Sequence, residues 1–211
     1  MWIKEPFPHC IIENFISRTD LERINLEWPD LSHKAKNTSI KGSTTALPPT
    51  ADALVEYMNG PAFVKKLSRE TGIDLIPDHS LSGGGLHEIR QGGFLKAHVD
   101  FNEKGLPDKS LIYRRLNALL YLNLEWRDEW GGHLNLYDAP ADPVKMPSPS
   151  VSIAPLGGRL VMFETSNTSW HGHPEPLNTP NGVCRRSLAL YYYSREPAQS
   201  NHERSSTIYR D

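Results

Sequence analysis

The chain has 211 residues, of which 38% are hydrophobic and 23% charged, and its formal net charge is −2. A chain of this length can bury one substantial core, and its composition excludes a largely disordered protein. The charge does not favour a nucleic-acid partner, and no apolar run approaches the ~20 residues that a membrane span needs. Because the first residues carry no signal-peptide pattern, we expect a soluble, cytoplasmic protein with one domain over residues 1–211. The sequence predicts no oligomeric state.

Residues 1–79 are expected to form helices that support the rest of the chain, joined by a loop. Ser17 and Asp20 have the spacing of a capping pair, apolar residues at helical spacing follow, and Pro29 ends this first helix. Two further helices are expected, one from about residue 50 and one from Pro61 to Gly72. Residues 32–45 lack hydrophobic periodicity, which predicts a polar loop between the first two helices.

Short strands are expected over residues 80–195. Apolar and polar residues alternate there in segments that glycine, proline, asparagine and aspartate interrupt. The expected strands are 86–90, 94–99, 112–124, 133–137, 151–154, 159–164, 168–173 and 184–193. Helices followed by many short strands predict an α+β, mainly β fold, with a jelly roll as catalytic core backed by the N-terminal helices. Residues 196–211 are expected to form a polar, loosely held tail.

A histidine and an aspartate two residues apart form a candidate metal site. His98 and Asp100 lie at the end of an expected strand, where residues two apart face the same side. A later strand offers His171 or His173 as the third ligand. Two histidines and one carboxylate on one face match the arrangement that binds non-haem Fe(II) and leaves positions open. The alternative is a set of surface side chains at strand ends.

A candidate anion site lies on the last expected strand. Alternation places Arg185 and Ser187 on one face, and Arg186 on the other face among apolar residues. An arginine beside a hydroxyl can hold a carboxylate, and a buried guanidinium needs such a partner. The alternative is an exposed arginine pair on an edge strand.

Five segments, in order along most of the chain, resemble one family. They are residues 6–15 (PFPHCIIENF), 92–100 (GGFLKAHVD), 115–123 (RLNALLYLN), 130–134 (WGGHL) and 158–163 (GRLVMF). Together they resemble Fe(II)/2-oxoglutarate dioxygenases of the prolyl-4-hydroxylase-like superfamily. The resemblance implies a double-stranded β-helix, one Fe(II) ion, 2-oxoglutarate as co-substrate, and O2. By this resemblance His98, Asp100 and His171 match the catalytic iron ligands, and His171 is preferred to His173 because it follows Ser-Trp.

The resemblance also implies a site for 2-oxoglutarate. Arg185 and Ser187 match the pair that binds its distal carboxylate, and Tyr121 matches a tyrosine of the central strand that reaches it. Alternation on that strand places Asn117 and Leu119 beside Tyr121, facing the pocket. Core packing is an equal alternative for Leu119.

The implied reaction hydroxylates an unactivated C–H bond and converts 2-oxoglutarate to succinate and CO2. A chain of this length leaves little room for a separate peptide-binding domain, which favours a small-molecule substrate. One alternative is a prolyl hydroxylase that acts on a peptide or protein. Another is a non-catalytic jelly-roll or cupin-like binding module, because the fold alone does not define a function.

Basic side chains are expected around the mouth of the pocket. Lysines of the polar loop and an arginine before the central strand would form a basic rim that attracts an anionic substrate. The alternative is an ordinary solvated run of charges. The candidate substrate residues are His87, Trp130, His173, Arg114, Lys34, Lys36 and Lys41.

Overall fold

The computed structural model describes residues 1–31, 34–36, 39–141, 146–198 and 206–210, with the backbone alone for residues 34–36 and 39–42. The helices of these residues are α1 (Arg18–Leu26), α2 (Pro49–Asn59), α3 (Pro61–Thr71) and the short 3-10 helix η1 (Asp128–Trp130). The Ser17 hydroxyl accepts a hydrogen bond from the Asp20 N–H at 3.0 Å and so caps α1. Gly72 ends α3 in the left-handed region, at φ 72°. The three predicted helices are confirmed.

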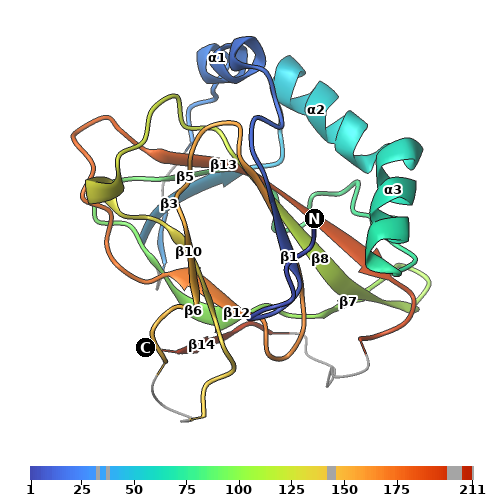
Figure 1. Ribbon diagram of the computed structural model, residues 1–211. Coiled ribbons are helices and arrows are strands. Elements are labelled where there is room, and N and C mark those ends of the chain that lie inside the picture. The colour runs from blue at the N-terminus through green and yellow to red at the C-terminus, as the bar shows by residue number, and fades with distance from the viewer. Residues whose placement is uncertain (32–33, 37–38, 142–145, 199–205, 211) are drawn as a thin grey trace.

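The strands form two antiparallel sheets that curve around a common interior (Figure 1). The large sheet contains β1 (His9–Ile12), β2 (Lys34–Lys36), β3 (Ser39–Thr44), β4 (Ile76–Pro77), β5 (Gly85–Ile89), β7 (Glu103–Gly105), β8 (Leu111–Tyr121), β11 (Leu160–Glu164) and β13 (Arg185–Ser194). The small sheet contains β6 (Leu95–Val99), β9 (Leu134–Tyr137), β10 (Val151–Ile153), β12 (Trp170–His173) and β14 (Ile208–Arg210). All eight predicted strands are present, with bounds that differ by a few residues.

Two segments differ from the prediction. Residues 34–36 and 39–44, expected in a loop, form β2 and β3, a hairpin that extends the large sheet beside β5. Residues 208–210, expected in a loose tail, form β14 and pair with β6 at the edge of the small sheet. Both segments gain backbone hydrogen bonds from a sheet edge that is distant in sequence, and their polar composition does not reveal such an edge.

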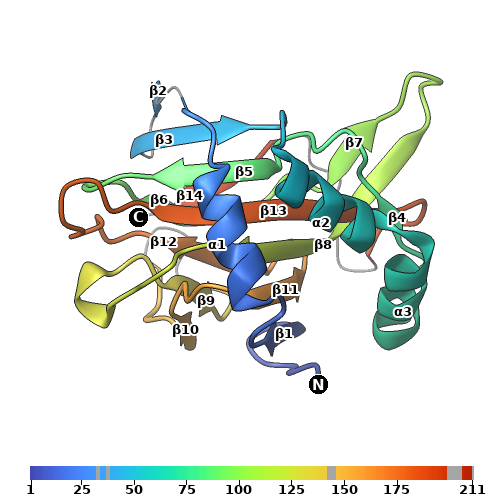
Figure 2. The ribbon, with the colours of Figure 1, turned by 90° about the horizontal axis from the view of Figure 1, so that it is seen from above.

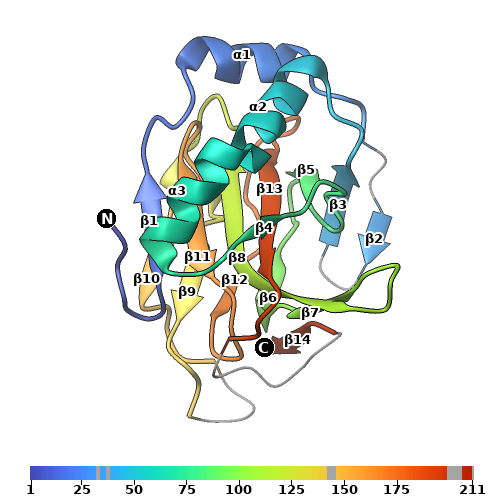
Figure 3. The same cartoon turned by 90° about the vertical axis from the view of Figure 1, so that its right-hand side faces the viewer.

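The helices cover the outer face of the large sheet (Figure 2), and in a view from the side they lie across β8 and β13 (Figure 3). Alternate residues of these two strands, among them Leu116, Leu120 and Leu188, pack against the helices in the largest apolar cluster. The opposite face points into the interior, where Tyr121 and Phe163 belong to a second cluster. The predicted phase of both central strands is therefore confirmed over these residues.

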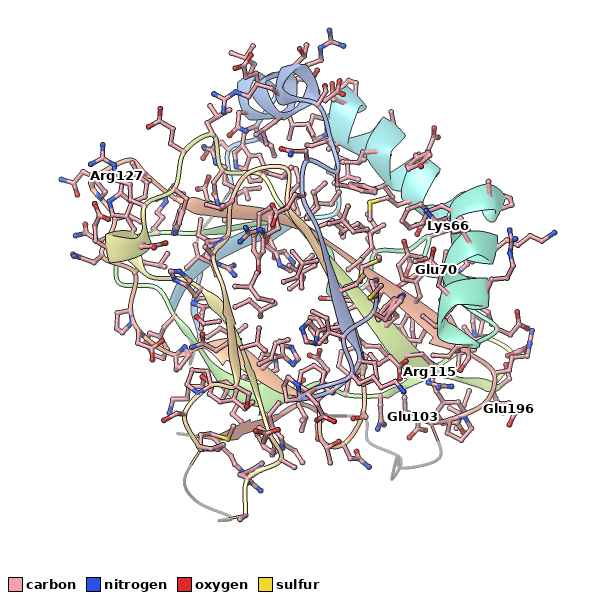
Figure 4. The ribbon with its side chains drawn as sticks, in the orientation of Figure 1. Lys66, Glu70, Glu103, Arg115, Arg127 and Glu196 are labelled. Carbon is pink, nitrogen blue, oxygen red and sulfur yellow. The ribbon has the colours of Figure 1, made fainter. Side chains whose placement is uncertain are left out.

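Charged side chains lie mainly at the periphery. Arg127, for example, projects from the turn before η1 (Figure 4), and its side chain is 66% exposed. Within the described residues, no helix combines the length and the apolar composition that crossing a lipid bilayer requires.

Candidate active site

Three side chains that can ligate a metal meet on neighbouring strands of the small sheet. His98 lies on β6, and its antiparallel partner on β12 is His171. Asp100 directly follows β6. The ligating atoms of these three buried residues all lie within 4.8 Å of one another. Two imidazoles and one carboxylate are a donor set that suits Fe(II) with open positions, so the residues fit the ion that the sequence resemblance implied.

Backbone carbonyl groups orient both histidine rings. Nδ1 of His98 lies 2.9 Å from the carbonyl oxygen of Lys96, and Nδ1 of His171 lies 2.9 Å from that of Ser169. A ring that donates from Nδ1 leaves the lone pair of Nε2 for a metal. These Nε2 atoms lie 3.5 and 3.4 Å from the carboxylate oxygens of Asp100. Burial, and then His98, lowers the pKa of His171, which favours the neutral, metal-binding form.

His173, the alternative third ligand, lies outside this cluster. The register between β12 and β6 shifts between His171 and His173, so that His173 lies opposite Leu95. A Cβ atom on Gly172 would lie 2.8 Å from the carbonyl oxygens of both Leu95 and Lys96. Glycine at this position therefore allows the two strands to approach closely at the metal cluster.

An arginine and an asparagine hold the carboxylate of Asp100. Nη2 of Arg114 lies 3.2 Å from Oδ2 of Asp100, and Nδ2 of Asn117 donates to the same oxygen at 2.8 Å. Nε of Arg114 also donates to Oδ1 of Asn117 at 2.7 Å. Burial alone would raise the pKa of Asp100, but the charge of Arg114, and then its contact with His171, hold it well below its usual range. The carboxylate is therefore ionised, and both Arg114 and Asn117 bind its Oδ2 atom.

The prediction that Arg114 lies on an exposed rim is wrong. Arg114 is only 2% exposed, and its guanidinium lies 3.4 Å from the ring centroid of Tyr191. Its positive charge is balanced by Asp100, so it does not attract an anionic substrate. Arg114 lies within β8, and the register of that strand against β13 decides which way its side chain faces.

A β-bulge turns Arg114 toward the interior. Tyr192 pairs with Leu116, but Tyr193 pairs with Arg114, so Arg115 is the extra residue of β8. The bulge reverses the alternation of faces, and Arg114 joins the face that carries Asn117. Arg115 instead turns outward near Glu196 (Figure 4), whose carbonyl oxygen accepts a hydrogen bond from Arg115 at 3.2 Å.

The replacement Arg114→Met should weaken metal binding by about 10- to 100-fold, the usual effect of losing an outer partner of a metal ligand. It should also lower the free energy of unfolding by about 3–5 kcal/mol, because Asp100 would remain buried without its cation. Isothermal titration with Zn(II) and urea unfolding measure the two effects.

Arg115→Met is the matched control, because this neighbour contacts Ser194 and Glu196 on the outside. Its metal affinity should stay within about twofold of that of the unchanged protein, since its contacts lie outside the cavity. Equal losses of metal affinity in the two variants would contradict the positioning role of Arg114.

Arg185 forms a second polar centre. Its Nε donates to the carbonyl oxygen of Gly132 at 2.8 Å, and its Nη2 donates to the hydroxyl of Tyr121 at 3.2 Å. Burial lowers the pKa of Arg185, Tyr121 opposes this effect, and no carboxylate of the described residues contributes. A buried guanidinium without an anion is costly, and its shape matches a carboxylate. Ser187 lies buried one step along the same face of β13 and adds a hydroxyl.

Arg186 has partners on the opposite face of β13. Its Nε donates to Glu88 at 2.9 Å, its Nη1 donates to Asn25 at 2.9 Å, and its guanidinium lies 4.6 Å from the ring centroid of Trp28. The alternation that separated Arg185 from Arg186 in the sequence therefore matches the structure.

One cavity of about 220 Å³ contains both polar centres. The predicted residues along its wall, besides the metal cluster and Arg185, are Asn117, Leu119, Ser187, His87, His173 and Arg114. Trp130 is not among the residues that line this cavity. It lines a separate groove together with Arg186. The side chains of Lys34, Lys36 and Lys41 lie outside the described part of the chain.

Four aromatic residues of this cavity were missing from the predicted site: Phe94, Phe101, Tyr191 and Tyr209. Alternation on β13 already places Tyr191 on the face of Arg185, and Phe101 directly follows Asp100 in the sequence. Tyr209 had no local signal, because it reaches the cavity only through the pairing of β14 with β6.

The model of the 2OG-Fe(II) oxygenase superfamily matches residues 84–193, which include the metal cluster and Arg185. The chain belongs to this superfamily. Its cofactor is Fe(II), and its co-substrates are 2-oxoglutarate and O2, which confirms the predicted class of a 2-oxoglutarate-dependent dioxygenase.

A curated relative, prolyl 3-hydroxylase OGFOD1 from Mus musculus, is 32% identical over 198 residues. The match covers 90% of this chain and 33% of the relative, so the chain spans about a third of that protein.

Solved structures share the fold. HygX from Streptomyces hygroscopicus, crystallised with nickel, 2-oxoglutarate and hygromycin B, has a TM-score of 0.62 at 13% identity, over 88% of this chain and 82% of its own. A prolyl-4-hydroxylase from Pseudomonas putida has a TM-score of 0.55 at 20% identity, over 89% of this chain and 93% of its own. The double-stranded β-helix is thereby confirmed.

Proposed function

We propose that this chain is a single catalytic domain that hydroxylates a prolyl residue of a peptide or protein. The similarity to the prolyl 3-hydroxylase OGFOD1 carries the proposal, because it extends over 90% of the chain, whereas the oxygenase family model matches residues 84–193. A small-molecule substrate was expected from the length of the chain and is not confirmed. The prolyl alternative agrees better with this relative.

His98, Asp100 and His171 are the proposed ligands of Fe(II). Each histidine presents Nε2, because its Nδ1 faces a backbone carbonyl group. Arg114 and Asn117 fix the carboxylate of Asp100 from the side of Oδ2. Bound Fe(II) with 2-oxoglutarate and O2 supplies the oxidising chemistry, and the chain positions these groups.

Arg185 and Ser187 are the proposed partners of the distal carboxylate of 2-oxoglutarate. Arg185 can form a charge-assisted pair with it, while the Tyr121 hydroxyl and the Gly132 carbonyl group hold the guanidinium in place. Leu119 lies on the wall of the same cavity and adds apolar surface to it.

The substrate is proposed to bind mainly through shape and apolar contacts. Arg114 is neutralised by Asp100. This pairing lowers the net positive charge that an anionic substrate would meet in the cavity. The aromatic residues of the cavity instead offer a surface for an aliphatic ring.

A library of proline-containing peptides tests the proposed function. The protein, Fe(II), 2-oxoglutarate and ascorbate are incubated with the peptides, and mass spectrometry with fragmentation locates any added oxygen atom. The expected product carries one oxygen on a prolyl ring and forms together with an equal amount of succinate. Oxidation of a small metabolite, with no prolyl product from the library, would overturn the proposal.

A further inference from the structure

The position of Tyr209 follows from the pairing of two strands. β14 lies antiparallel to β6, and Tyr209 lies directly opposite His98. Directly opposed residues of an antiparallel pair share one face of the sheet, with Cβ atoms about 4.5–5.5 Å apart. The register therefore places the side chain of Tyr209 on the same face of the small sheet as the side chain of His98, a proposed metal ligand. The neighbours Ile208 and Arg210 lie opposite Val99 and Ala97, on the other face.

Contacts on both faces agree with this register. The ring of Tyr209 lies 5.3 Å from the ring of His98, at an interplanar angle of 32°. On the outer face, the guanidinium of Arg210 lies 4.4 Å from the ring centroid of Trp170, the residue before His171.

Tyr209 retains free surface beside the metal cluster. It is 49% exposed, while it also forms part of the cavity wall. One part of its ring therefore contacts His98, and the rest is available to a ligand. An aromatic face of this kind suits an aliphatic ring, whose weakly positive C–H groups meet the negative face of the π system.

We propose that Tyr209 determines substrate specificity, as the wall of the subsite on which the ring of the target proline packs. The inference rests on the proposed prolyl hydroxylation and deepens it. The residues predicted to form a loose tail thereby complete the substrate site, because β14 brings Tyr209 next to His98.

Kinetics of three variants test the contact. Tyr209→Ala should raise the KM for the best prolyl peptide by about fivefold to tenfold, which corresponds to the loss of one aromatic contact. The KM for 2-oxoglutarate should rise less. Tyr209→Phe should keep a peptide KM near that of the unchanged protein, because it retains the ring. Ile208→Ala is the matched control on the outer face of the same strand, and an equal effect there would show that a loosened β14, not the Tyr209 ring, causes the change.

A spectroscopic measurement tests the placement without turnover. With 3-fluorotyrosine incorporated at position 209, bound Mn(II) should broaden the fluorine signal strongly, and Zn(II) should leave it sharp. The peptide that the protein hydroxylates should then shift the signal of the Zn(II) form. A sharp signal with Mn(II), or no shift with that peptide, would overturn the inference. If no prolyl peptide is hydroxylated, the proposed function and the prolyl occupant both fail, while the broadening still decides whether Tyr209 lies at the metal site.

Discussion

Replacing His98 or His171 with alanine, or Asp100 with asparagine, should reduce Fe(II)-dependent succinate formation at least about 100-fold. Changes in the outer partners of a metal ligand already cost about 10- to 100-fold, so the loss of a ligand should cost more. Asparagine removes the negative charge as alanine would, but it keeps the size of the side chain and an oxygen that can accept a hydrogen bond from Arg114. Zn(II) titration should show the same order of loss in affinity, and circular dichroism should show that the β fold persists.

His173→Ala is the control for this set. It lies on the same strand as His171 but outside the cluster of ligating atoms, so its metal affinity should stay within about threefold of that of the unchanged protein. Loss of metal binding in His173→Ala, with binding kept in His171→Ala, would show that the third ligand has been assigned to the wrong histidine.

Arg185→Leu should raise the dissociation constant of 2-oxoglutarate by about 10- to 150-fold. A hydrogen bond to a charged group contributes about 1.5–3 kcal/mol, and Arg185 has no carboxylate partner among the described residues. Thermal unfolding of the Zn(II) form provides the measurement. At 100 times the dissociation constant, 2-oxoglutarate should stabilise the unchanged protein by about 2.7 kcal/mol, and the same concentration should stabilise Arg185→Leu far less.

Arg186→Leu separates this role from a general loss of stability. Its guanidinium bonds to Glu88 and Asn25 on the helix side of β13, so the variant should unfold more readily. The added stability from 2-oxoglutarate should nevertheless match that of the unchanged protein. If Arg186→Leu lost this response and Arg185→Leu kept it, the assignment of the two faces of β13 would be inverted.

Much of the fold could be predicted because it depends on local periodicity. Helix α1 begins after Ser17, whose hydroxyl caps it, and this signal lies within four residues of the chain. Along β13, and along β8 from Leu116 onward, alternate residues face the helices and the cavity. The same period of two placed Arg185 and Ser187 together and Arg186 apart, before any tertiary contact was known.

The sequence by itself determined the helices, the main strands and the types of side chain at both polar centres, since spacing of a few residues decides them. Only the tertiary structure decided where Arg114 and Tyr209 lie. The extra residue of β8, Arg115, reverses the faces at that point, and its presence depends on the pairing with β13. Tyr209 reaches His98 because β14 finds the free edge of β6, a contact between segments about a hundred residues apart that no local pattern encodes.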